Sequence, residues 1–157
     1  MNQGAFQVLA GQYRDTVFRV ALNYLGNPYD ADDIVQEVFL KLYTRNKHFE
    51  SDNHARYWLI RVAVNSCKDV LKSSWKNKNV FLEEVEVPVK FEHPDQEDLY
   101  KAVMGLPEKY RIVLYLYYYE DYKIKEIAKL LKMNVSSVTT RLSRARTQLK
   151  EVWKNEE

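Results

Sequence analysis

Small hydroxyl residues and arginines are interleaved along residues 136–146, in the stretch SSVTTRLSRAR. A hydroxyl group both donates and accepts hydrogen bonds, and a guanidinium carries five donors in a planar fork. The wider segment 122–150 has eight Lys and Arg residues and one acidic residue, Glu126, whereas the whole chain has a formal net charge of only +2. A local positive surface of this kind is suited to phosphate groups, and its arginines are suited to the acceptor edges of bases.

The spacing of apolar residues predicts the helix that presents these side chains. An apolar stripe at steps of four and three predicts an amphipathic helix over about residues 135–153, through Val138, Leu142, Ala145, Leu149 and Val152. A shorter helix over about 123–131 and a tight turn at 132–134 precede it, with Asn134 as the N-cap. A short helix, a turn and a longer helix form a helix-turn-helix, whose second helix enters the DNA major groove.

A solvated basic face is the simpler interpretation of a basic helix taken alone, but the preceding helix and turn favour DNA binding. With the apolar stripe inward, hydroxyl and guanidinium groups lie on the opposite face and its flanks. Arg can fork onto guanine, and residues further along suit phosphate contacts. The predicted DNA-contacting residues are Ser136, Ser137, Thr139, Thr140, Arg141, Arg144 and Arg146.

The remaining pattern predicts an all-α fold of two small helical domains joined by an extended linker, with the helix-turn-helix in the second. Helices are expected at about 4–25, 30–43, 55–73, 96–105 and 107–120, with Asp30 capping the second and residues 45–55 as a loop. Residues 74–95 lose helical periodicity and alternate apolar with polar residues, which also suits a strand. Because no partner strand is evident, we interpret them as a linker. The predicted domains are 1–73 and 96–157.

Composition argues against several functions. The chain has no run of 18 apolar residues and no secretory pattern at its start, so we expect no membrane insertion. Cys67 is the single cysteine, which fits a reducing cytoplasm. The spacing of His48, His54 and Cys67 matches no usual zinc pattern. With no phosphate loop and no nucleophile–base motif either, we expect no metal, no cofactor and no enzymatic activity.

Three motifs in order resemble one family over about residues 5–153. LPEKYRIVLYLYYYEDYKIKEIAKLLKMNVSSVTTRLSRARTQLKE resembles region 4 of bacterial sigma factors. DADDIVQEVFLKLY resembles their region 2.2, and HFESDNHARYWLIRVAVNSCKDVL resembles regions 2.3 and 2.4. With only these two domains, the chain is similar to the extracytoplasmic-function class of the sigma-70 family.

The resemblance implies a transcription initiation factor that binds core RNA polymerase and promoter DNA, is monomeric when free, and has an anti-sigma partner. Domain 1–73 would bind polymerase and the −10 element, and domain 96–157 the −35 element. The linker would either thread polymerase channels or act as a solvated tether. The implied polymerase-binding residues are Asp32, Asp33, Gln36 and Glu37. The implied −10 residues, around a reading loop at 50–56, are Lys41, Phe49, Asn53, Arg56, Arg61 and Asn65.

Some positions depart from the family pattern or stay open. Lys132 occupies a turn position where relatives often have Gly, so we expect a positive φ there. Lys123 stands where relatives often have a capping Ser or Thr, and Asp121 is a substitute candidate. Thr139 stands where relatives often have a cation, which predicts a different recognition of the −35 element.

Trp58 is expected in the core, and the role of Tyr57 is left open. The alternative function is a conventional helix-turn-helix regulator that binds operator DNA without polymerase.

Overall fold

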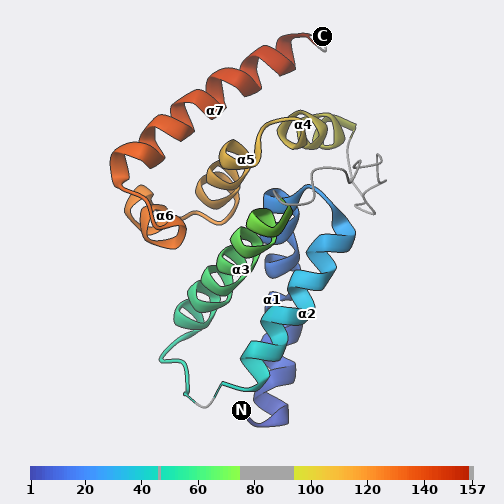
Figure 1. The fold of residues 1–157 in the computed structure, drawn as a ribbon, viewed down its shortest axis with the longest axis vertical. Helices are drawn as coiled ribbons and strands as arrows, with labels where there is room; N and C mark the ends of the chain where they lie inside the picture. The colour runs from blue at the N-terminus through green and yellow to red at the C-terminus, as the bar shows by residue number, and fades with distance from the viewer. Residues whose placement is uncertain (46, 75–93, 156–157) are drawn as a thin grey trace. The chain divides into compact units, whose positions relative to one another are not determined.

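The computed structural model describes residues 1–45, 47–74 and 94–155, and these residues form helices without any strand (Figure 1). The predicted all-α fold is therefore confirmed for the described part of the chain. The elements are α1 Gln3–Leu25, α2 Pro28–Tyr43, α3 Asp52–Ser74, α4 Pro94–Met104, α5 Glu108–Leu114, the π-helix η1 Tyr115–Tyr119, α6 Ile124–Leu131 and α7 Val135–Asn155. The chain divides into two compact units, unit 1 (Met1–Glu86) and unit 2 (Val87–Glu157). Most of the predicted linker, residues 75–93, lies outside the described residues.

Unit 1 is a three-helix bundle in which α1, α2 and α3 each contact the other two. Side chains at helical spacing from all three helices are withdrawn from solvent, as the apolar periodicity predicted. The fully buried ones include Val17, Val20, Ile34, Leu42, Leu59 and Ile60. Burial of each such side chain stabilises the fold by about 1.5–3 kcal/mol, so this shared core fixes which face of each helix turns outward.

The connection between α1 and α2 is made by three residues with distinct roles. Gly26 ends α1 in the left-handed region, at φ 70°. Asn27 then caps α2, because its Oδ1 accepts hydrogen bonds from the backbone N–H groups of Tyr29 (2.8 Å) and Asp30 (3.2 Å). Pro28 is the first helical residue, where its missing N–H is harmless. The expectation that Asp30 caps this helix was wrong: Asn27 and Pro28 start it earlier.

The start of α3 also differs from the expectation. Ser51 is the cap, since its Oγ accepts from the N–H of His54 (3.1 Å) and its carbonyl accepts from the N–H of Ala55 (3.1 Å). The Tyr13 hydroxyl of α1 donates to the carbonyl of Asp52 (3.1 Å) and ties this start to the bundle. The predicted loop at 45–55 is therefore shorter. Much of the proposed reading loop at 50–56 is the first turn of α3, including Asn53 and Arg56.

Unit 2 is organised around α7, which contacts α4, α5 and α6. Its buried residues come mainly from α4, α5, η1, α6 and α7 and include Ala102, Ile112, Val113, Leu116, Ile127, Leu130, Val138 and Leu142. Tyr117 is half-buried. The Arg111 side chain joins α4 to α5, because its Nη1 donates to the carbonyls of Met104 (3.2 Å) and Leu106 (3.0 Å). Burial lowers the pKa of this guanidinium, and Glu108 opposes the shift.

The helix expected at 107–120 is divided. Pro107 precedes α5 with extended ψ (149°) instead of being its first residue, and the chain widens into η1 after Leu114. The N–H of Glu120 donates to the carbonyl of Tyr115 (3.1 Å), five residues back, which is the π-helical pattern. The Tyr115 hydroxyl also donates to the buried Glu120 carboxylate, so both ends of η1 are tied together.

Cys67 gives this fold a measurable pH dependence. Its side chain is fully buried in unit 1. That burial, with a smaller contribution from the Glu37 carboxylate, raises the pKa of the thiol to about 12. In an unfolded chain a cysteine ionises at roughly pH 8.5. Between these values only the unfolded state releases the proton, so rising pH favours unfolding.

We therefore predict that Cys67→Ala flattens the alkaline pH dependence of the stability of unit 1. The free energy of unfolding of the wild-type chain should fall, relative to that of Cys67→Ala, by up to about 1.4 kcal/mol per pH unit above pH 9. Urea unfolding followed by circular dichroism between pH 7 and pH 10.5 measures this difference. Parallel pH profiles for the two proteins would contradict the prediction.

Candidate nucleic-acid interface

The turn between α6 and α7 has the conformation that the sequence predicted. Lys132 ends α6 in the left-handed region, at φ 56° and ψ 50°. The next N–H, of Met133, donates back to the carbonyl of Ala128 (2.9 Å) and closes the helix end. At the other end of α6, the Glu126 carboxylate accepts from the N–H of Lys123 (3.0 Å). The expectation that Asp121 performs this capping was wrong.

Asn134 begins α7, as predicted. Its Oδ1 accepts from the N–H of Ser137 (2.7 Å) and from the hydroxyl of Ser136 (2.9 Å). The Thr139 hydroxyl donates to the carbonyl of Val135 (3.0 Å). The Ser136 and Thr139 hydroxyl protons are thus used within the helix, while their oxygens can still accept hydrogen bonds from a ligand.

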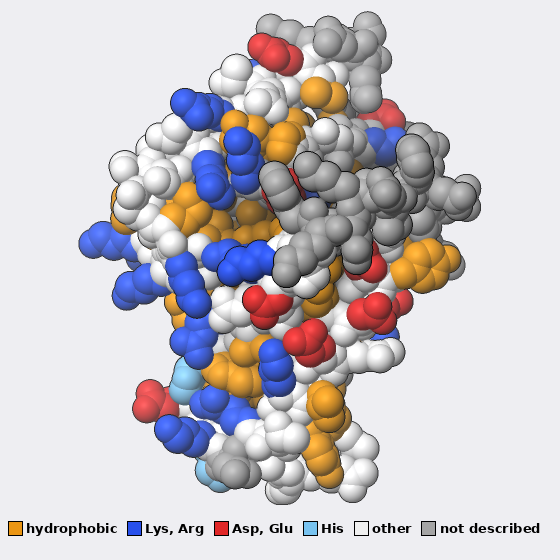
Figure 2. Space-filling model, viewed as in Figure 1, with side chains coloured by type: hydrophobic (Ala, Val, Ile, Leu, Met, Phe, Trp, Pro, Cys, Tyr) orange, Lys and Arg blue, Asp and Glu red, His pale blue; other side chains and the backbone are white. Residues whose placement is uncertain are grey.

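The rotation of α7 brings four of the predicted residues onto one side. Its stripe Val138, Leu142 and Ala145 is buried, and Leu149 and Val152 are half-buried. Thr140 and Arg144 are exposed, and Ser137 and Arg141 are half-buried on the same side of the helix. Figure 2 shows Lys and Arg side chains spread over α6 and α7. Hydroxyls and guanidinium groups therefore share one solvent-facing side of this helix.

Arg146 lies elsewhere on the helix. Two residues beyond Arg144, it is turned by roughly 160° around the axis, given 3.6 residues per turn. Its Nε donates to the hydroxyl of Tyr118 (2.6 Å), and its guanidinium carbon lies 5.5 Å from the ring centroids of Tyr117 and Tyr118. The sequence analysis missed this partner, because 28 residues separate Tyr118 from Arg146 and no local pattern links them.

In unit 1, Phe49 lies at the centre of a small aromatic cluster. Its ring centroid is 5.2 Å from that of His54 and 5.6 Å from that of Trp58. The Arg45 guanidinium carbon lies 4.4 Å from the Phe49 centroid and 5.0 Å from that of Trp58. The sequence analysis missed Arg45. An open pocket of about 290 Å³ adjoins this cluster and is lined partly by Leu9, Arg45 and Phe49.

Trp58 does not belong to the core. It is half-buried, and it shares one outward stripe of α3 with His54, Arg61 and Asn65 at steps of four, three and four. Its apolar character led to the wrong expectation. Phe49 and Arg45, which lie outside the helix, cover the Trp58 ring in place of core residues. Arg56 lies roughly 140° around α3 from Arg61 and is not part of this stripe. The structure thus brings together Phe49, Arg61 and Asn65, with Trp58 between them.

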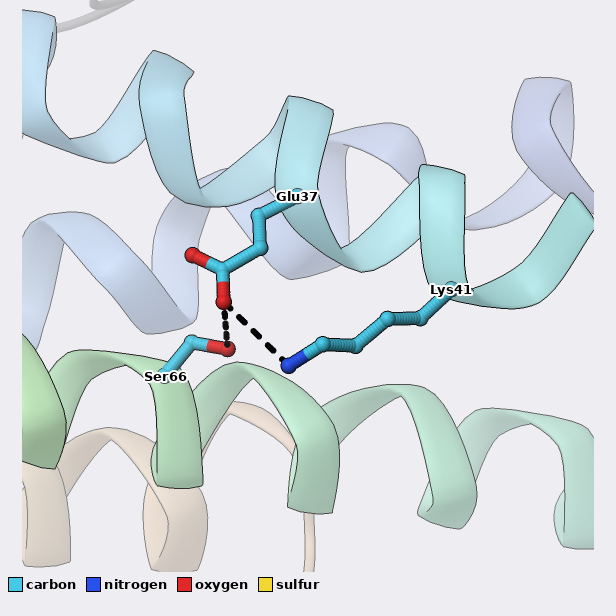
Figure 3. Close-up of polar contacts among 3 residues, drawn as sticks. All are labelled: Glu37, Lys41 and Ser66. Atoms are coloured by element: carbon cyan, nitrogen blue, oxygen red, sulfur yellow. Dashed lines mark hydrogen bonds and ion pairs between the residues drawn. The ribbon is translucent and has the colours of Figure 1, made fainter. Parts of the chain in front are cut away.

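The predicted polymerase-binding residues all lie on α2. Asp32, Asp33, Gln36 and Glu37 are exposed there, and Figure 2 shows acidic side chains over this helix. Glu37 differs from the others because it also faces α3 (Figure 3). Its Oε1 accepts from the Lys41 ammonium (3.2 Å) and from the Ser66 hydroxyl (3.3 Å).

Comparisons with known proteins agree with this geometry. The family described as Sigma-70 region 2 matches residues 9–77, and Sigma-70 region 4 matches residues 96–149. RNA polymerase sigma factor SigV of Bacillus subtilis strain 168 is 30% identical, over 85% of this chain and 81% of the relative. ECF RNA polymerase sigma factor SigW of the same organism is 26% identical, over 95% of this chain and 89% of the relative. The chain belongs to the extracytoplasmic-function class of the sigma-70 family.

A solved structure has the same fold. The sigma factor RpoE of Bartonella quintana, in complex with the anti-sigma factor NepR, superimposes with a TM-score of 0.80. It is 21% identical, and the match covers 98% of this chain and 99% of that one. A sigma factor of this class acts in transcription initiation together with RNA polymerase, which excludes the alternative of an independent helix-turn-helix regulator. No helix among the described residues is sufficiently long and apolar to span a membrane.

Lys132 gives a test of the helix-turn-helix geometry in this sigma factor. A residue with a Cβ at φ 56° is strained, and glycine relieves that strain. We predict that Lys132→Gly raises the free energy of unfolding of unit 2 by about 0.5–1 kcal/mol. Lys129→Gly, in the interior of α6, is the matched control and should lower it by a similar amount. Thermal unfolding followed by circular dichroism measures both, and destabilisation by Lys132→Gly would contradict the turn geometry.

Proposed function

We propose that this sigma factor binds core RNA polymerase mainly through α2, recognises the −10 element with the aromatic and basic surface of unit 1, and grips the −35 element with α7. Residues 1–73 and 96–157 would perform these two roles, with 74–95 as the linker. The observation that carries the proposal is the solvent-facing side of α7, where hydroxyl and guanidinium groups lie opposite a buried apolar stripe.

The α2 surface is the polymerase-binding part of the proposal. Asp32, Asp33 and Gln36 offer acidic and amide groups beyond the bundle core, which suits a basic partner surface. The carboxylate of Glu37 contributes charge to this surface while its Oε1 is engaged by α3.

The −10 part of the proposal combines a pocket with flanking donors. Phe49 supplies an aromatic wall beside the 290 Å³ pocket, which can take an unstacked base. Asn53 and Asn65 supply amides for base edges. Lys41, Arg56 and Arg61 supply charge for the strand's phosphates.

The −35 part rests on the N-terminal half of α7. Arg141 and Arg144 would reach guanine acceptors or clamp the backbone, with Ser137 and Thr140 allowing close approach. Ser136 and Thr139 would accept hydrogen bonds near the helix start. Arg146, held by Tyr118, would contact a phosphate from the other side of the helix.

The proposed factor has no catalysis and no cofactor of its own and works as a monomer in the cytoplasm, where polymerase and DNA are found. An anti-sigma factor is its proposed regulator. Support comes from the solved RpoE, which is held by the anti-sigma factor NepR. Run-off transcription with purified core polymerase on genomic promoter fragments tests the function directly and identifies a promoter. Polymerase-independent transcription control, with no run-off product, would refute it.

Arg144→Ala tests the −35 assignment. Loss of a forked guanidinium contact should reduce transcription from −35-dependent promoters by roughly tenfold or more, with core binding unchanged. Lys109→Ala removes the same charge from α5 and is the matched control, expected to be silent. Multiple-round transcription on promoters with and without a −35 element measures the effect. An equal loss at both promoter types would contradict the assignment.

Asp33→Lys tests the polymerase-binding face. Reversing an exposed charge opposite a basic partner should weaken core binding by about tenfold, because repulsion replaces attraction. Asp15→Lys makes the same charge change on α1 and serves as the control. Fluorescence anisotropy with labelled sigma factor and core polymerase gives both dissociation constants. Wild-type affinity in Asp33→Lys would place the docking surface elsewhere.

A further inference from the structure

Ser66 connects α2 to α3 through a shared acceptor. Ser66 is 2% exposed, in the middle of α3, and its hydroxyl donates to Oε1 of Glu37 (3.3 Å). The same oxygen accepts from the Lys41 ammonium (3.2 Å). Figure 3 shows both side chains converging on the one carboxylate oxygen in the seam between the two helices.

The buried hydroxyl restricts where the carboxylate can be. A buried hydroxyl requires a hydrogen-bond partner, and turning Glu37 outward would remove this one. An exposed pair of opposite charges four residues apart on a helix is weak and mobile by itself. Here the carboxylate also accepts a hydrogen bond from a second helix, which favours one position of the acceptor that the half-exposed Lys41 ammonium meets.

The direction of the two helices determines which part of α3 the Lys41 side chain follows. α2 and α3 run in opposite directions (Figure 1), so Lys41, one turn after Glu37, lies against the turn of α3 that precedes Ser66. That turn comprises residues 62–65. Figure 3 shows the Lys41 side chain extending along α3.

We propose that Ser66 is a positioning residue for promoter DNA: it holds Glu37 against α3, and Glu37 in turn holds the Lys41 ammonium at the seam between α2 and α3. The −10 strand then meets a cation whose position is set by both helices. This inference rests on the proposed function, in which Lys41 contacts that strand. Ser66 itself is buried and touches neither DNA nor polymerase.

The test compares Ser66→Ala, Lys41→Ala and the double variant. Each is assembled into holoenzyme at saturating sigma concentration, and its affinity for a promoter fragment that the wild-type holoenzyme transcribes is measured over a series of salt concentrations. Lys41→Ala should weaken binding several-fold and reduce the salt slope by about 0.7–0.9, the loss of one phosphate contact. Ser66→Ala should weaken binding by about two- to fivefold, the range of an ion pair near the surface.

The double variant decides whether Ser66 acts through Lys41. If it does, the double variant binds no more weakly than Lys41→Ala alone, since there is no ammonium left to position. Ser73→Ala is the matched control: its exposed hydroxyl also lies on α3 but bonds to the carbonyl of Asp69 (3.2 Å), and its loss should be silent. Effects of Ser66→Ala and Lys41→Ala that multiply in the double variant would overturn the proposal, because they would indicate a general packing role.

The remaining outcomes separate this inference from the proposed function. A silent Lys41→Ala overturns both the DNA role of Lys41 and the positioning role of Ser66. Wild-type affinity in Ser66→Ala, with a defective Lys41→Ala, overturns the positioning role alone.

Glu37→Gln provides a second test if Ser66→Ala does not fold. It keeps an acceptor for Ser66 but removes the charge that holds Lys41. It should weaken promoter binding in the wild-type background and not in Lys41→Ala, and a loss in both would refute the proposal.

Discussion

Burial of the apolar stripe of α7 is the constraint on which the proposed DNA-facing surface depends. Each of Val138 and Leu142 stabilises the fold by about 1.5–3 kcal/mol when withdrawn from water, whereas leaving Arg144 in solvent costs nothing. A helix has one rotation that satisfies both conditions, and it points Arg144 and Thr140 outward. The orientation of the proposed reading side is thus set by the core, with no requirement for contacts among the reading residues themselves. The caps at Lys132 and Asn134 then fix where the helix starts and the angle at which it leaves the turn.

The same argument explains how much of the molecule could be predicted. Helix existence and the inward faces of α1, α2 and α7 follow from apolar spacing, because one clear stripe on each helix decides its rotation. The first residue of a helix was harder to predict where several residues suited to capping lie close together in the sequence. Asp30 and Asn27 are both good caps by type, and Pro28 favours Asn27 because proline is well tolerated in a first helical turn. The capping role of Ser51 was not predicted, because the run of polar residues around it is equally typical of a loop.

The site residues show a second limit of prediction from sequence: an apolar side chain is not always buried in the core. Trp58 was assigned to the core, yet it lies on the outward stripe of α3 because Phe49 and Arg45 provide it with an external cover. Arg146 shows a related limit. It is exposed, and its contact with Tyr118 depends on the π-helical turn that carries the tyrosine. Contacts between segments distant in sequence determine both cases, and no local period encodes them.

These placements bear on why such a factor would act through polymerase. The net charge of the chain is only +2, so long-range attraction to DNA is weak, and a clear excess of positive charge occurs locally, as in residues 122–150. Part of it is already engaged within the protein: Lys41 pairs with Glu37, and Arg146 with Tyr118. Two surfaces of this size bind usefully when a common scaffold presents both, because the second contact then forms at a high effective concentration. A similar effect applies to single side chains. A cation that neighbouring side chains already hold in position loses less conformational entropy when it binds a phosphate.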